Sequence, residues 1–322
     1  MWRSASILAR SRAAYDTLLE RFYFAATAPT GLAICRIWLY AFVIYVVLDN
    51  DVRQWASVPA DLWRPILLLG WVPQSLVSIE VLSAARLALL TAAGCSLLGL
   101  ATKLSTRLTL GLAIFVFGLA QCFGKVNHGL TLVMFALAIF ALSRCGDALS
   151  LDAWWARRGG RPVPANSGEY RWPIALMQAL MVTVFFASAV CKLRNSGLAW
   201  VTSDHLLNTL LRNHYTGHHP PTGLGLWLAQ FPLLCHLVAA LSLWSEFSAP
   251  LALYIRWYRW MVVPCLLAMQ VSIYLTMGVN FEGFWVCYLF WVDWNWVAQR
   301  FMALARQPIL VAISSSSSSS SS

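Results

Sequence analysis

Apolar stretches of about 20 residues recur along the chain and constrain its fold more than any other feature. A helix rises about 1.5 Å per residue, so each stretch can cross the roughly 30 Å hydrocarbon core of a bilayer. Only 11% of the residues are charged, against about 25% in soluble domains, and the mean hydropathy is +0.65. The sequence therefore predicts an integral membrane protein built from helices, which satisfy their own backbone hydrogen bonds in lipid.

Eight stretches are expected to span the membrane as an all-α, polytopic helix bundle. They cover roughly residues 29–49, 78–100, 106–124, 128–144, 172–192, 230–254, 260–279 and 281–298. The transmembrane domain is thus residues 29–300. An amphipathic cytoplasmic leader (1–28) precedes it, and a C-terminal tail (301–322) that ends in nine serines follows it.

The positive charges predict an orientation. With the N-terminus inside, 15 of the 23 Lys and Arg residues fall in cytoplasmic segments and 6 in outer segments. This bias predicts a multi-pass protein of the inner (cytoplasmic) membrane with both termini in the cytoplasm. Topology and attraction to anionic membrane lipids account for the net charge of +10, so no nucleic-acid partner is expected.

Lys192 ends the fifth apolar stretch, on the outer face. An ionisable residue inside a membrane is a candidate for function. We expect its amine to be held uncharged and to act as a base, which works best if Glu246 does not pair with it directly. The alternatives are an interfacial lysine that reaches water for Lys192, and for Glu246 a partner of Arg36 or a proton relay.

Further polar residues are expected near the same outer end of the bundle. His128 follows Asn127 at the start of the fourth stretch, and Asn280 lies beside Glu282 between the last two stretches. His128 is either a reacting group or a histidine bonded to the backbone at a helix start. These positions complete a candidate polar core around Lys192.

The longest outer segment, 193–229, predicts a helix that begins near Ser203 or Asp204 and carries leucines on one face. It would lie over the outer mouth of the bundle as a lid, or on the surface without a gating role. The segment also holds four histidines whose spacing matches no standard zinc pattern, so we predict no metal site. They are His205, His214, His218 and His219.

The segment from Phe186 to Leu193, Phe-Ala-Ser-Ala-Val-Cys-Lys-Leu, together with Trp200, resembles the one that carries the catalytic lysine of vitamin K-dependent gamma-carboxylases. These enzymes belong to the wider, mostly bacterial HTTM (horizontally transferred transmembrane) domain family. The similarity covers roughly residues 20–300. The other matching positions are Arg36, Asn127-His128, the segment Leu149-Ser150-Leu151-Asp152, and Glu246 with Pro250.

This resemblance implies a membrane enzyme whose pocket opens outward. Lys192 would be the base, acting with a reduced, vitamin K-like quinone as cofactor, and His128 and Asn127 would position the reacting group. Arg36 and Glu246 would organise the polar core. The remaining binding positions would be Trp200, Gln270 (where the carboxylases carry a histidine) and Asn280.

Three functions therefore remain open. The first is an enzyme of the carboxylase or monooxygenase type that acts on a quinone-like or other lipid-phase substrate at the outer membrane face. The second is a non-catalytic maturation factor for an exported peptide or lipoprotein. The third is a small-molecule transporter.

Overall fold

The computed structural model describes residues 19–123, 129–216 and 219–301. Within these ranges every regular element is a helix, and an isolated β-bridge pairs Thr27 with Ser167. The predicted all-α fold class is therefore confirmed for the described part of the chain.

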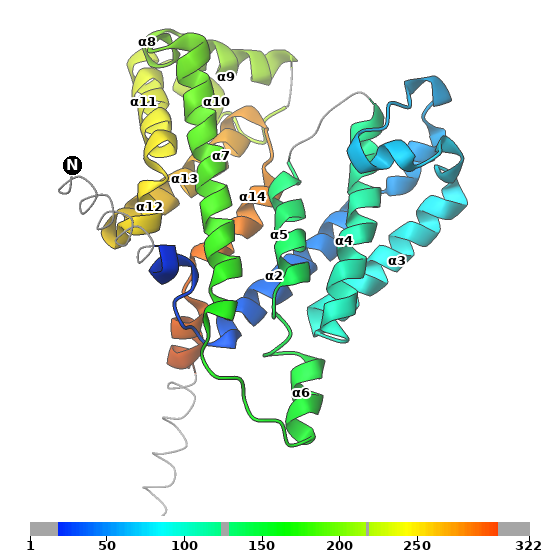
Figure 1. Cartoon of the computed structure of the whole chain (residues 1–322). Coiled ribbons are helices and arrows are strands. Elements are labelled where there is room, and N and C mark those ends of the chain that lie inside the picture. The colour runs from blue at the N-terminus through cyan, green and yellow to red at the C-terminus, as the bar shows by residue number, and fades with distance from the viewer. Residues whose placement is uncertain (1–18, 124–128, 217–218, 302–322) are drawn as a thin grey trace, which may run out of the picture.

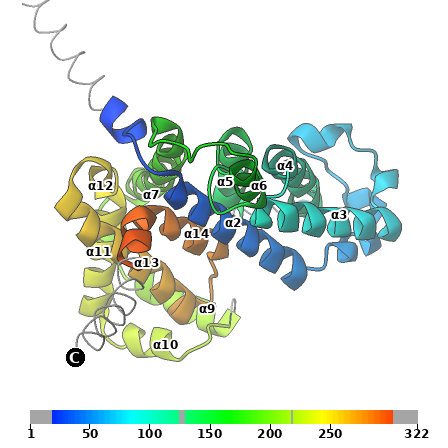
Figure 2. The same ribbon diagram turned by 90° about the horizontal axis from the view of Figure 1, so that it is seen from below.

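Helix α2 (Pro29–Asp49) crosses the centre of the molecule, between two groups of helices (Figures 1 and 2). The N-terminal group contains α3 (Ile79–Leu98), α4 (Thr102–Leu119) and α5 (Thr131–Leu142). Four short 3-10 helices lie between α2 and α3, and one more follows α4. They are η1 (Val52–Ser57), η2 (Ala60–Leu62), η3 (Leu67–Trp71), η4 (Gln74–Leu76) and η5 (Ala120–Phe123).

The C-terminal group is built on α7 (Trp172–Ser196), α11 (Pro232–Ser248) and α13 (Arg256–Met277). Helix α6 (Leu151–Arg158) and η6 (Gly168–Tyr170) connect the two groups. The other elements are short. They are α8 (Ala199–Thr202), α9 (His205–Thr216), α10 (Leu224–Ala229), α12 (Leu251–Tyr254), α14 (Glu282–Cys287) and η7 (Tyr288–Trp291).

Five of the described helices are long and apolar enough to cross a membrane. They are Pro29–Asp49, Ile79–Leu98, Thr102–Phe123, Gly168–Ser196 and Arg256–Met277, and each overlaps a predicted stretch. Helices α5 and α11 are apolar but have only 12 and 17 residues, fewer than the roughly 20 that span a bilayer. Helix lengths thus support a membrane protein with five candidate spans, and eight crossings stay a prediction.

The last predicted stretch, 281–298, is not one continuous helix. Helix α14 ends at Cys287, η7 ends at Trp291, and Val292 is extended. A new helix starts after Asp293, whose Oδ1 accepts a hydrogen bond from the backbone N–H of Trp296 at 3.1 Å. A carboxylate in this position caps a helix start, so the break has a cause that hydropathy does not register.

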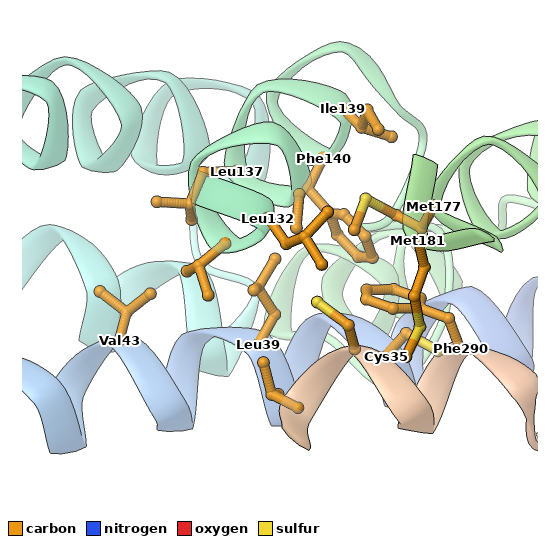
Figure 3. Packing of buried hydrophobic residues seen from close by; sticks show 14 of the residues in the cluster. Cys35, Leu39, Val43, Leu132, Leu137, Ile139, Phe140, Met177, Met181 and Phe290 are labelled. Carbon is orange, nitrogen blue, oxygen red and sulfur yellow. The ribbon is translucent and has the colours of Figure 1, made fainter. Parts of the chain in front are cut away.

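The apolar core joins the two groups of helices along α2. Phe140 of α5 packs against Phe290 of η7 with 5.9 Å between ring centroids. Figure 3 shows this layer, in which side chains of α2 face those of α5, α7 and η7. The buried residues include Cys35, Leu39, Val43, Leu132, Leu137, Phe140, Met177, Met181 and Phe290.

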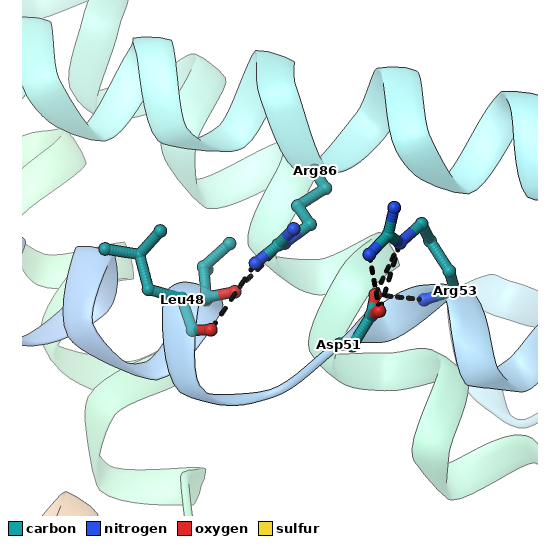
Figure 4. Close-up of polar contacts among 5 residues, drawn as sticks. Leu48, Asp51, Arg53 and Arg86 are labelled. Carbon is teal, nitrogen blue, oxygen red and sulfur yellow. Dashed lines mark hydrogen bonds and ion pairs between the residues drawn. The ribbon is translucent and has the colours of Figure 1, made fainter.

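The end of α2 is held by a cation from α3 (Figure 4). Arg86 donates from Nε to the carbonyl of Val47 at 3.2 Å and from Nη2 to that of Leu48 at 3.4 Å. The last carbonyls of a helix lack intrahelical partners and carry partial negative charge, which the guanidinium satisfies. Next to it, Asp51 and Arg53 form an exposed ion pair at 2.7 Å.

The segment 193–229 folds into three short helices, α8, α9 and α10, and the leucine pattern predicts the second of them. Leu210 of α9 is fully buried, and α10 is tied to the end of α13. The Thr222 hydroxyl donates to the carbonyl of Leu275 at 2.7 Å. A Cβ on Gly225 would lie 2.4 Å from the carbonyl oxygen of Thr276, so only glycine permits this approach.

Candidate functional site

Lys192 lies on α7 and reaches across to α11. Its Nζ donates a hydrogen bond to Oε2 of Glu246 at 2.5 Å. Ser188, one turn before Lys192 on the same face of α7, donates to the other carboxylate oxygen at 3.5 Å. The lysine side chain is 18% exposed and that of Glu246 is 5% exposed, so the contact lies largely inside the protein.

An aromatic ring lies next to this pair, and others lie on neighbouring parts of the same helices. The ring of Trp200 on α8 lies 5.1 Å from Nζ of Lys192, within the range of a cation–π contact. The ring of His205, the first residue of α9, lies 4.4 Å from that of Trp200. Phe247 follows Glu246 and packs against Phe186 at 5.3 Å, with both rings exposed. The amine therefore lies beside the ring of Trp200.

The direct contact corrects one expectation for the site. Lys192 was expected to act as a base without a paired acid, whereas Glu246 is its hydrogen-bond partner. In a low-dielectric interior, a buried carboxylate without a cation would be strongly unfavourable, and this contact supplies the cation. The two side chains form a single acid–base pair, in which one proton can be held at Nζ or at Oε2.

Arg36 belongs to a different place in the fold. It is fully buried on α2 and donates to the carbonyl of Cys145 at 2.9 Å and to that of Leu149 at 2.6 Å. Both oxygens lie in the connection between α5 and α6. The alternative that Glu246 is the partner of Arg36 is wrong, because Glu246 binds Lys192. Arg36 and Glu246 thus do not form one polar core.

Three residues add contacts around the Arg36 junction, and they lie in α6, just before α6 and at the end of α3. Asp152 of α6 accepts from the backbone N–H groups of Ala101 and Thr102 at 2.9 and 2.7 Å, so it caps the start of α4. Gly99 has φ +69°, and a Cβ there would lie 2.2 Å from that of Ser150. Ser150 caps α6, since its hydroxyl accepts from the backbone N–H of Ala153. These contacts fix backbone segments, which is a structural role.

The remaining candidates lie elsewhere or cannot be placed. Asn127 and His128 fall outside the described residues. Gln270 is buried in α13, and its Oε1 has no hydrogen-bond partner among the described atoms. Asn280 donates from Nδ2 to Oε1 of Glu282. Of the predicted site residues, the structure therefore brings together Lys192, Glu246 and Trp200.

Two cavities lie beside α14, and Asn280 and Glu282 line both of them. The first has a volume of about 730 Å³ and extends between the ends of α2, α4 and α5. The second has a volume of about 650 Å³ and is lined by five aromatic residues that the sequence reasoning missed. Three of these, Trp38, Phe42 and Tyr45, share one face of α2. Residues spaced by four and then three positions lie on one face of a helix, so the sequence could have indicated this aromatic face.

Neither a disulfide nor a metal cluster stands out in the described part of the chain. All eight cysteines are free, and no group of three or more potential ligands among the described residues could hold a metal ion. His236 approaches Asp204 at 3.4 Å from Nε2 to Oδ1, as a single pair. The chemistry of the site is therefore argued from the lysine and the carboxylate.

Comparison with other proteins does not assign a family or a function to this site. No protein-family model, curated protein or solved structure matches the chain.

Proposed function

We propose that this chain is a membrane enzyme of the HTTM type, related to vitamin K-dependent gamma-carboxylase, in which Lys192 and Glu246 act as an acid–base pair. The observation that carries the proposal is the 2.5 Å contact between Nζ and Oε2 on two apolar helices. Ionisable pairs inside a membrane are costly and typically occur where protons or substrates are handled. A lysine whose surroundings change its protonation state is a common catalytic base.

The chain's own residues define the step. When the proton of the pair is on Oε2, the uncharged amine of Lys192 takes a proton from a weakly acidic hydroxyl presented beside it, and the ammonium that results is held by its hydrogen bond to the carboxyl group of Glu246. Trp200 offers a flat ring next to Nζ, and the exposed Phe186–Phe247 pair offers a further apolar surface. A reduced quinone would stack on the ring of Trp200 and, when bound, would supply the acidic hydroxyl and reducing equivalents.

The proposal includes a topology. Both termini lie in the cytoplasm, the transmembrane domain crosses the inner membrane of a bacterium eight times, and Lys192 acts near the outer face. The charge bias of 15 to 6 supports this orientation. An exported peptide or protein would then be a natural partner, because it is met on the outer side.

The test uses the purified protein in nanodiscs with a reduced naphthoquinone and oxygen. We expect Lys192→Met to slow the loss of the reduced naphthoquinone about 100-fold, the lower end of what a positioned base contributes. Lys192→Arg keeps a cation next to Glu246 but cannot serve as a base, so it should be as inactive while remaining folded. Lys103→Met, at an exposed lysine on α4, is the matched control.

Two outcomes would contradict the proposal. Equal rates for the wild-type protein and Lys192→Met would show that the lysine is not the base. A wild-type rate no faster than the protein-free background would instead favour a non-catalytic role in the maturation of an exported peptide.

A further inference from the structure

The second cavity beside α14 has an unusual lining. Trp38, Phe42 and Tyr45 of α2 form one wall, and Tyr274 of α13 and Trp285 of α14 form another. The rings of Tyr274 and Trp285 meet nearly at right angles, with 84° between their planes and 5.7 Å between their centroids. Five aromatic faces and edges thus border one space of about 650 Å³.

A single acidic side chain shares this space. Glu282 lines the cavity next to Asn280, whose amide donates to its Oε1. Among the described residues, no lysine, arginine or histidine lines the cavity, and none forms an ion pair with Glu282. Asp49, which lines the neighbouring cavity with Glu282, adds a second negative charge nearby.

We propose that this aromatic groove binds the headgroup of a trimethylammonium amphiphile. Aromatic faces attract a cation through the ring quadrupole, and cages of such rings recognise quaternary ammonium groups. A trimethylammonium group has no N–H to donate, so it is held by rings and by the charge of a nearby carboxylate rather than by a specific hydrogen bond. The groove supplies both.

An amphiphile, rather than a water-soluble cation, fits the position of the groove. Trp38 and Tyr45 are each about half exposed, at 49% and 50%, on a helix that is a candidate membrane span. The side of α2 that they share faces out of the bundle, and in a membrane it meets lipid. A headgroup in the groove can therefore keep its hydrocarbon chain in the bilayer, where chain burial adds roughly 0.8 kcal/mol per CH₂. The site is distinct from the Lys192–Glu246 pair and does not depend on the proposed enzymatic function.

The test is photo-crosslinking of the full-length protein in dodecyl maltoside micelles, which carry no ammonium group. The probe is a photoreactive alkyl-trimethylammonium, and labelled peptides are mapped by mass spectrometry. We expect labelling on α2, α13 and α14. It should be displaced by an unlabelled alkyl-trimethylammonium but about tenfold less well by its neutral 3,3-dimethylbutyl isostere, which has the same size without the charge.

Two pairs of variants separate the contributions of charge and rings. Glu282→Gln should weaken labelling about tenfold, whereas Glu80→Gln, at an exposed acid on α3, should not. Trp285→Leu should weaken it about fivefold, whereas Trp257→Leu, at an exposed ring elsewhere on α13, should not. Equal displacement by the neutral isostere would overturn the proposal in favour of a general apolar groove. Unchanged labelling of Glu282→Gln, with the protein still monodisperse, would also overturn it.

Discussion

Arg36 and Lys192 are both cations on apolar helices, and the structure accommodates them in different ways. Arg36 is fully buried and gives its hydrogen bonds to two backbone carbonyls. Lys192 keeps part of its surface exposed and gives its hydrogen bond to a carboxylate. A carbonyl oxygen cannot take up a proton at any relevant pH, whereas a carboxylate can. The proton therefore has one possible position at the Arg36 site and two at the Lys192 site.

This difference separates structure from chemistry among residues that look alike in the sequence. A cation within an apolar stretch is unusual in either case. The role of such a cation depends on its hydrogen-bond partner. A cation bonded to backbone oxygens holds two chain segments together, whereas a cation bonded to a carboxylate can take part in proton transfer. Four predictions test this division, in order of decreasing effect.

The largest effect on stability is expected from replacing Arg36. Arg36→Leu leaves the carbonyls of Cys145 and Leu149 buried without donors, and charge-assisted hydrogen bonds contribute about 1.5–3 kcal/mol each. We expect a loss of roughly 3–5 kcal/mol in unfolding free energy, measured by chemical denaturation in detergent micelles. Arg36→Lys should recover only part of it, because one ammonium cannot reproduce the fork. A loss below about 1 kcal/mol would mean that the junction does not depend on Arg36.

The acid–base pair should behave differently, because its loss can be compensated. Lys192→Met leaves Glu246 without its cation, and the carboxyl must then take up a proton or remain charged in an apolar setting. We expect a cost of about 2 kcal/mol. Adding Glu246→Leu should restore most of the stability while leaving the protein inactive. A double variant no more stable than Lys192→Met alone would show that the pair is not an isolated unit.

A smaller effect is expected where Asp152 caps α4. Asp152→Ala removes the acceptor for the N–H groups of Ala101 and Thr102. The expected cost is about 1 kcal/mol, the usual value for a lost helix cap, seen as a lower melting temperature without loss of catalytic turnover. If turnover falls while the melting temperature is unchanged, the Arg36 junction has a role in the chemistry after all.

The exposed Asp51–Arg53 pair should have the least effect. Hydrogen bonds from Arg53 lower the pKa of Asp51 from 3.8 to about 2. Its favourable contribution is therefore present above the unfolded pKa and is lost only as the pH falls toward 2. Because the pair is exposed and screened, Asp51→Asn should leave the melting temperature unchanged between pH 5 and pH 8. A measurable shift would show that this end of α2 is less solvated than the structure indicates.

The sequence predicted those parts of the fold that are set locally. The stretches at 29–49, 78–100, 106–124, 172–192 and 260–279 each overlap a long apolar helix, because run length alone determines such helices in lipid. The helix from 205 to 216 and the cap at Ser150 were also predictable, since both depend on residues a few positions apart. The break after Trp291 was readable in principle, because Asp293 provides a capping carboxylate within an apolar run.

The pairings between helices were not predictable in the same way. Glu246 is 54 residues from Lys192, and the oxygens that bind Arg36 are more than 100 residues from it. When a helix is apolar on all sides, its sequence does not show which face packs against a neighbouring helix. The expectation that Arg36 and Glu246 share one core failed for this reason. The cavity beside Tyr274 and Trp285 was missed because its walls come from three segments of the chain.

The attachment of α10 to the end of α13 limits how the segment 193–229 can move. Gly225 lies against the backbone at Thr276, and the Thr222 hydroxyl donates to the carbonyl of Leu275, so this part of the segment 193–229 is joined to α13 rather than hinged beside it. A segment fixed in this manner moves together with α13 and not on its own. Any rearrangement of this segment would therefore also displace the end of a candidate membrane-spanning helix.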